Sequence, residues 1–529
     1  MLQSSPETDK ESKARLAPLM NPGDYRRDFA AYCSTLMRER YNHHAGLTSA
    51  PRFEPIKERY SDLWTREALD DLDGALEQTP AQFETERAAL RALTASARLN
   101  YLESSASEVS AELSRCTEAA RVDWVGGLRV RADEAKDLIV VETDGARRRE
   151  LAARWFDALR SCDDLRAARL ESLRESAREC GCGSLRALFE ETAGVDWEAL
   201  AASARAFLER TASAYHRSLA RWKMKASVAA VSQEALSYAD ALSFERATLL
   251  DDFFRALDVR AVYAELMRGL GVRVERQTNL QVDDAARPSK KRRAASFGVT
   301  PPTDVRLVFH AEETGTRAFV DFLREAGRAQ SLSWASKEQA TRYPEFVYPP
   351  DSATEQAHGF LFANLLTDAA WLGELRGVRA TEAHEAAGAL ALVELYEARR
   401  TSAALLYAQA LSESADVRSD ALAETYSALY TEATGFRHDP VTRLFHAEEA
   451  FAAVASLRAR LFAVGWRDYL RGRHGRRWYA SRAAGDELID IWNTASRYGV
   501  EELARLVGVG ELSFELLADE LTTAVASFE

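Results

Sequence analysis

Two arginines four residues apart, Arg324 and Arg328, enclose Glu325 in the segment 322–329. Side chains at this spacing lie on one face of a helix, where like charges repel by roughly 0.2–0.5 kcal/mol. An arginine stays protonated and has no lone pair for a metal ion, but it binds carboxylates through charge-assisted hydrogen bonds. Glu355 follows Arg328 by 27 residues. Guanidinium groups need counter-ions if they are buried, and our hypothesis is that both arginines pair with Glu355, with Glu325 as a further partner, in a metal-free ionic plug.

The expected cost of breaking this plug depends on its burial. Removing one partner of a buried ion pair costs about 3–5 kcal/mol, so Glu355→Ala should then destabilise the fold markedly. In the alternative arrangement, both arginines extend their charged ends to water and need no partner.

A second arrangement of side chains could bind a metal ion. Glu355 and His358 are three residues apart, a spacing that serves metals in helical bundles, and His310 ends a predicted strand. The nearby arginines would repel a cation, so this site is an alternative only. His384 also begins a zinc-like motif, but Gly388 stands where its second ligand would be.

The segment 322–329 resembles in outline the zinc helix of the thimet-oligopeptidase-like gluzincin metallopeptidases. In that family the helix reads His-Glu-x-x-His and follows a strand, and a glutamate on the next helix completes the zinc site. Arg324 and Arg328 stand at the two histidine positions. Glu325 takes the position of the general base, and Glu355 takes that of the third ligand. The resemblance implies a degenerate member that lacks the zinc-binding histidines, binds no zinc and has no active catalytic residue.

Other parts of the sequence agree with this resemblance in chain order, over about residues 22–525. The family carries tyrosines on a late helix. That helix aligns here with residues 448–461, which contain no tyrosine and have Phe451 and Val454 near the expected positions. Four further segments resemble the N-terminal and C-terminal helices of the family: Tyr41–Gly46, Pro55–Tyr60, Tyr469–Trp478 and Glu501–Arg505.

The resemblance implies a mainly α fold. It would be a gluzincin-like helical two-lobed ellipsoid with a deep channel and a small β-sheet beside the former zinc helix. We expect residues 1–21 to form a disordered tail and residues 22–529 to form a single peptidase-like unit of two discontinuous lobes. The small β region would lie at about 270–312, and the degenerate zinc-site helices at about 316–330 and 354–368.

The residue pattern itself predicts helices with one short β region. Apolar residues recur at three- and four-residue spacing in the stretches 83–113, 151–180 and 197–226, which indicates amphipathic helices. The alternation over 305–310 predicts a strand. The basic run 290–293 is expected to be a solvated loop rather than a nucleic-acid patch.

Composition sets limits on the function. The 529 residues include only 26 glycines and 13 prolines, which favours long helices, and the formal charge of −13 disfavours nucleic-acid binding. No window has the ~18 apolar residues that cross a membrane, and residues 1–13 lack the hydrophobic centre of a signal peptide. The five cysteines are scattered, so we expect a reducing, cytoplasmic environment without a disulfide framework. Cys180 and Cys182 should be two thiols in a turn.

These observations predict a zinc-less pseudopeptidase that binds a peptide or protein partner without hydrolysing it. Arg324 and Arg328 would receive the C-terminal carboxylate of a peptide, with Arg306 and His358 as further binding candidates. One alternative is a structural or regulatory subunit with a closed channel. Another is an active metallo-oligopeptidase with a relocated metal site. We expect no cofactor, no nucleic acid and no membrane partner, and the oligomeric state stays open.

Overall fold

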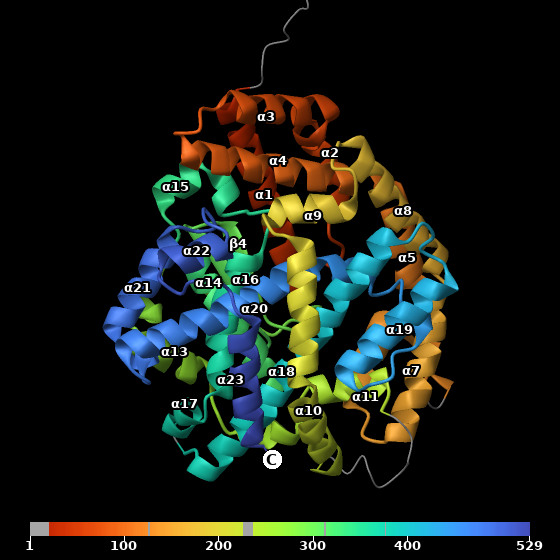
Figure 1. Ribbon diagram of the computed structural model, residues 1–529, viewed down its shortest axis with the longest axis vertical. Coiled ribbons are helices and arrows are strands. Elements are labelled where there is room, and N and C mark those ends of the chain that lie inside the picture. Colours follow the sequence, from red (N-terminus) through yellow and green to blue (C-terminus); the bar gives the residue numbers. More distant parts are fainter. Residues whose placement is uncertain (1–20, 125–126, 226–235, 312–313, 376, 529) are drawn as a thin grey trace, which may run out of the picture.

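Helices dominate the computed structural model, which describes residues 21–124, 127–225, 236–311, 314–375 and 377–528 (Figure 1). The helices that precede the main sheet are α1 (Pro22–His44), α2 (Phe53–Arg59), α3 (Arg66–Gln78), α4 (Glu84–Ser105), α5 (Ser107–Ala119), α6 (Ala132–Val141), α7 (Gly145–Arg160), α8 (Asp163–Glu179), α9 (Leu185–Ala193), α10 (Trp197–Lys225), α11 (Tyr238–Glu245), α12 (Asp251–Arg255) and α13 (Val259–Gly269). Those that follow it are α14 (Thr316–Ser333), α15 (Lys337–Arg342), α16 (Ala353–Ala363), α17 (Ala369–Glu374), α18 (Ala380–Glu413), α19 (Asp420–Thr434), α20 (Ala447–His474), α21 (Arg482–Asn493), α22 (Val500–Leu506) and α23 (Phe514–Ala526).

The predicted N-terminal tail lies outside the described residues, except for Asn21. The Asn21 side chain accepts a hydrogen bond from the backbone N–H of Gly23 and so caps the start of α1. Figure 1 shows α1, α3 and α4 at one end of the molecule and the C-terminal end of α23 at the opposite end. In the described part of the chain, no helix has the length and apolar character needed to cross a membrane.

Two stretches predicted as single helical runs are each divided into two helices. The stretch 83–113 breaks at Ala106, between α4 and α5, and the stretch 151–180 breaks between α7 and α8. Cys162 lies in the second break and forms a disulfide with Cys116 of α5. The expectation of a chain without disulfides was therefore wrong. The two cysteines are 46 residues apart but their Cα atoms are 6.0 Å apart, and sequence spacing does not reveal such proximity.

The predicted β region is a three-stranded sheet with the order β3–β5–β4. Strand β5 (Asp304–Val308) pairs in parallel with β3 (Leu280–Asp283) and antiparallel with β4 (Ala295–Thr300). Strands β4 and β5 contact α14, and β4 also contacts α1. A separate short hairpin, β1 (Arg121–Asp123) with β2 (Arg129–Arg131), was not predicted. Its three-residue strands are too short to give an alternating pattern.

In the basic run 290–293 between β3 and β4, Lys291, Arg292 and Arg293 are exposed, as expected for a solvated loop, but Lys290 is not. The Lys290 side chain is buried, and its Nζ donates to the backbone oxygen of Asp283 at 2.9 Å and to the Asp283 carboxylate at 3.2 Å. The same carboxylate accepts hydrogen bonds from Arg287 and from the Tyr41 hydroxyl. Asp283, at the end of β3, thus holds the loop through hydrogen bonds from Arg287 and Lys290. Lys290 is therefore a structural residue beside the sheet.

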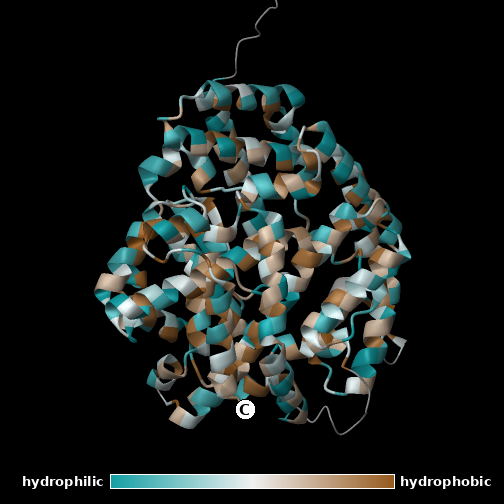
Figure 2. Cartoon of the chain, viewed as in Figure 1, coloured by the Kyte–Doolittle hydropathy of each residue, from teal (hydrophilic) through white to brown (hydrophobic). Residues whose placement is uncertain are grey.

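Two large hydrophobic cores fill the molecule, and α18 and α20 run through both. In α18, Leu395 belongs to one core and Leu405 to the other. In α20, Leu461 belongs to the same core as Leu395, and Leu457 belongs to the same core as Leu405. Figure 2 shows hydrophobic residues gathered along the central helices. The boundaries of the two predicted lobes stay a prediction, but these two helices are the elements that join the cores.

Candidate functional site

The site region begins where α14 and α16 cross at two glycines. A Cβ on Gly327 of α14 would lie 2.3 Å from the backbone oxygen of His358. A Cβ on Gly359 of α16 would lie 2.8 Å from the backbone oxygen of Arg324. Only glycine permits such a close approach of two backbones. The crossing brings Glu355, in the first turn of α16, beside the charged face of α14.

Arg328 lies between two carboxylates. Its Nη1 is 3.2 Å from Glu325 Oε2, and its Nη2 is 3.4 Å from Glu355 Oε2. Burial lowers the pKa of the Arg328 guanidinium, but the two carboxylates outweigh this effect and leave the pKa above its ordinary value. Glu325 also accepts hydrogen bonds from the backbone N–H and the hydroxyl of Ser296 on β4, at 2.9 and 2.7 Å. The expected ionic pairing is present for Arg328.

Arg324 differs from the expectation because it pairs with neither Glu325 nor Glu355. Its guanidinium lies over the Phe360 ring at 5.0 Å from the centroid, and the Arg460 guanidinium lies over the same ring at 4.3 Å. The Nε of Arg324 is buried and has no hydrogen-bond partner in the part of the chain that the structure describes. Burial lowers the pKa of Arg324, and the charge of Arg317 lowers it further. The aromatic ring thus takes the place that we expected a carboxylate to hold.

The other predicted binding residues, His358 and Arg306, contact side chains other than Arg324 and Arg328. His358 is buried, accepts a hydrogen bond from Trp492 Nε1 at 3.3 Å, and has its pKa lowered to about 4 by burial. Arg306 on β5 pairs with Asp304 and lies over the Tyr41 ring. No group of three or more His, Cys, Asp or Glu side chains within the described ranges could hold a metal ion. Glu355, His358 and His310 are accordingly not brought together.

A pocket of about 380 Å³ adjoins the two arginines. Its walls come from five helices, and sequence reasoning missed those from α18, α19 and α20 because no local motif marks them. The helix that we aligned at 448–461 is part of α20 and does line the pocket. Its Phe451 and Val454 side chains, however, belong to the hydrophobic core that contains Leu405. The pocket is lined by Arg324, Glu325, Arg328, Ser352, Gln356, Phe360, Glu397, Arg400, Thr401, Ala404, Tyr430, Glu449, Ala452, Ala453, Ser456 and Arg460.

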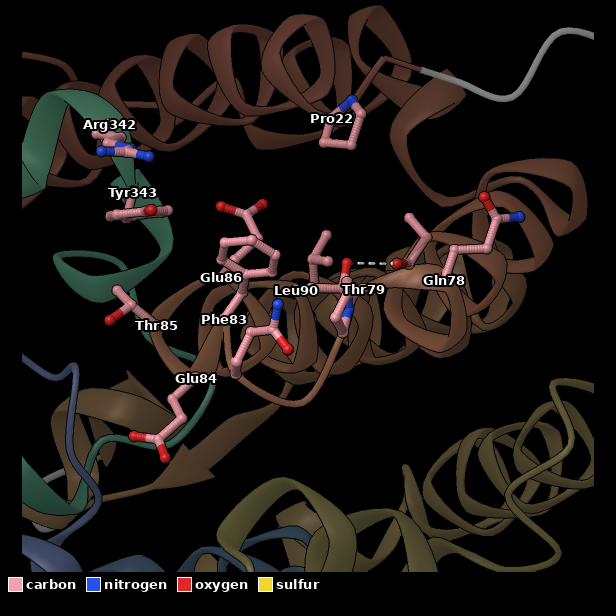
Figure 3. A pocket seen from close by; sticks show the side chains of 13 residues that line it. Pro22, Gln78, Thr79, Phe83, Glu84, Thr85, Glu86, Leu90, Arg342 and Tyr343 are labelled. Carbon is pink, nitrogen blue, oxygen red and sulfur yellow. Dashed lines mark hydrogen bonds between the residues drawn. The ribbon is translucent and has the colours of Figure 1, made fainter.

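A larger and more open hollow of about 850 Å³ lies among the N-terminal helices. Phe83, Glu86 and Tyr343 are among the side chains that line it (Figure 3). Arg26 lies over the Tyr343 ring and pairs with Glu86, so these walls are held by their own contacts. None of the predicted site residues lines this hollow.

The helical architecture, the small sheet against α14 and the crossing of α14 with α16 define an oligopeptidase-like fold. PZ peptidase A, solved with an inhibitor, has a TM-score of 0.66 at 12% identity, over 94% of this chain and 90% of that one. A candidate oligoendopeptidase F from Bacillus anthracis str. Ames has a TM-score of 0.62 at 12% identity, over 94% and 89%. The M32 carboxypeptidase from Deinococcus radiodurans R1 has a TM-score of 0.55 at 14% identity, over 96% and 98%.

These neighbours confirm the predicted fold class. No protein-family model matches the chain, and no curated protein matches it. Identities of 12–14% show the fold alone, so the activity of the neighbours is not carried over.

Proposed function

We propose that this chain is a zinc-less pseudopeptidase that binds a peptide in the pocket beside Arg324 and Arg328 without hydrolysing it. The observation that carries the proposal is the position of the Arg328 guanidinium, which contacts both Glu325 and Glu355. In the family that the sequence resembles, a zinc ion would stand between a base and a ligand at these two positions.

The side chains at this place do not fit a zinc ion. Zinc needs neutral nitrogen, thiolate or carboxylate ligands, and a protonated guanidinium offers it no lone pair. The positive charge of Arg328 already lies against both of the carboxylates that a metal would bind. Hydrolysis by the zinc route is therefore not part of the proposal.

The pocket supports a binding role over a closed structural subunit. A volume of about 380 Å³ next to the arginines is within the range of ligand sites. Its lining includes charged groups, neutral hydrogen-bonding groups such as Gln356 and Ser456, and the aromatic ring of Phe360. This mixture suits the backbone and the ends of a peptide.

The proposal predicts that the purified protein carries far less than one zinc per chain and cleaves no quenched fluorescent peptide. We expect the same peptides, labelled but uncleaved, to bind in fluorescence anisotropy, with no effect of a chelator. Stoichiometric zinc in elemental analysis together with chelator-sensitive cleavage would overturn the proposal. Absence of any peptide binding would favour the structural subunit instead.

A pair of double variants tests whether the positions are those of a former zinc site. Arg324→His with Arg328→His places two imidazoles at i and i+4 beside Glu355, and this variant should gain zinc binding. Arg324→Gln with Arg328→Gln removes the same charges without adding ligands and is the matched control. Equal zinc content in the two variants would count against this origin.

A further inference from the structure

Two oppositely charged side chains of the pocket have no ion-pair partner within 4.0 Å among the described residues. They are Arg324 of α14 and Glu397 of α18. The other arginines of the pocket are neutralised: Arg328 as described, Arg400 by Glu449 at 3.1 Å, and Arg460 by Glu394. The pocket therefore presents one positive and one negative group that no described side chain pairs within 4.0 Å.

Arg324 and Glu397 face the same space without meeting. The carboxylate of Asp321 and, less strongly, that of Glu397 favour the charged form of Arg324, yet Glu397 and Arg324 are more than 4.0 Å apart. Both are partly buried, and such charges are costly when left unpaired. A ligand that carries one charge of each sign would satisfy both groups at once.

The surroundings hold the positive group in a defined place. The Phe360 ring supports the Arg324 guanidinium on one side, and Arg460, over the same ring, adds a second positive charge nearby. Glu394 holds Arg460, so Arg460 does not need the ligand to stay in position. Gln356, Thr401 and Ser456 add neutral polar groups to the walls.

We propose that the pocket binds a short peptide with both ends free, its C-terminal carboxylate on Arg324 and its N-terminal ammonium on Glu397. The inference rests on the proposed function and adds to it the class of ligand. The volume of about 380 Å³ is near the low end of ligand pockets, which span roughly 300–1,000 Å³, and favours a peptide of few residues over a long chain.

The test is equilibrium dialysis of the full chain against dipeptide pools with randomised side chains, read by mass spectrometry. Four pools are compared: free, N-acetylated, C-amidated and blocked at both ends. Each charged hydrogen bond contributes about 1.5–3 kcal/mol, so blocking either end should lower retention roughly 10- to 100-fold. Equal retention of the free and doubly blocked pools, or retention of no pool, would overturn the inference.

Two variants test which residue binds which end of the peptide. Arg324→Gln should bind the free and amidated pools equally, because the carboxylate loses its partner. Glu397→Gln should bind the free and acetylated pools equally. A merely structural role would weaken all four pools by one factor, which would also overturn the inference. Binding of long labelled peptides together with equal binding of all dipeptide pools would leave the proposed function standing, whereas chelator-sensitive cleavage would remove that function itself.

Discussion

Arg324 and Arg328 are one helical turn apart and carry the same charge, but their surroundings differ. Arg328 is matched by Glu325 and Glu355, while Arg324 lies on the Phe360 ring beside a pocket. The same residue type, one helical turn apart, thus lies in two different environments. We infer that Arg328 stabilises the fold locally and that Arg324 is free to act on a ligand.

The contribution of Glu355 should be smaller than a fully buried pair would give. The side chains of Glu355 and Arg328 keep 16% and 29% of their exposure, and the contact is 3.4 Å long. Water therefore compensates part of the loss, and we expect Glu355→Ala to lower the free energy of unfolding by about 1–2 kcal/mol. Denaturant unfolding measures this.

The matched control for Glu355→Ala is Glu449→Ala, since Glu449 pairs with Arg400 at 3.1 Å but is 57% exposed. This variant should change the free energy of unfolding by less than about 1 kcal/mol. An equal effect of the two variants would show that the pair of Arg328 and Glu355 adds nothing beyond a surface ion pair.

The sequence was sufficient to predict one helix face of the site and no more. The four-residue spacing placed Arg324 and Arg328 on a common face, and Glu355 does lie near the start of a later helix, α16, although α15 separates that helix from α14 and α16 ends at Ala363. Phe360 and Arg460 could not be predicted as neighbours of Arg324. Such contacts depend on how α14, α16 and α20 pack, and that packing is tertiary information.

At the scale of elements, the crossing of α14 and α16 depends on the absence of two side chains. We expect Gly327→Ala to destabilise the protein by about 1–3 kcal/mol, because its Cβ would meet the His358 backbone oxygen at 2.3 Å. This loss should exceed the gain of up to about 1 kcal/mol that alanine gives over glycine inside a helix. Chemical denaturation measures the balance.

Gly472→Ala in α20 is the control for this prediction. A Cβ at Gly472 would find nothing within 4 Å, so the variant should be stabilised by about 0.5–1 kcal/mol. If Gly327→Ala were as stable as Gly472→Ala, the close crossing of α14 and α16 would be wrong.

The existence of most helices and of the small sheet followed from periodicity, whereas their ends did not. The breaks at Ala106 and Cys162 carry neither proline nor glycine, so nothing local marks them. The buried Lys290 was misread for a similar reason. Its partner Asp283 is close in sequence, but the compact turn that buries Lys290 is set by the sheet.

For the whole molecule, buried histidines predict a loss of stability in acid. Burial lowers the pKa of His358 to about 4 and that of His438 to about 3, from an ordinary 6.5. Below pH 6.5 the unfolded chain then binds more protons than the folded one, so stability is lost as the pH falls from 6.5 toward these values. For His358 alone, the loss reaches about 3 kcal/mol at its limit.

The variant His358→Asn isolates this effect, because an asparagine can still accept the hydrogen bond from Trp492 but does not titrate. The melting temperature of the wild type should fall more steeply than that of the variant between pH 7 and pH 4.5. Parallel curves would mean that His358 is not held neutral in the folded state.

The two long helices that join the cores also form the walls of the pocket, α18 through Glu397 and Arg400 and α20 through Ser456 and Arg460. An occupant of the pocket would therefore be coupled to the cooperative unfolding of both cores, because a ligand that binds only the folded state stabilises it by mass action. Conversely, substitutions that disturb packing in either core would weaken binding in the pocket, even where the substituted residue does not contact the ligand.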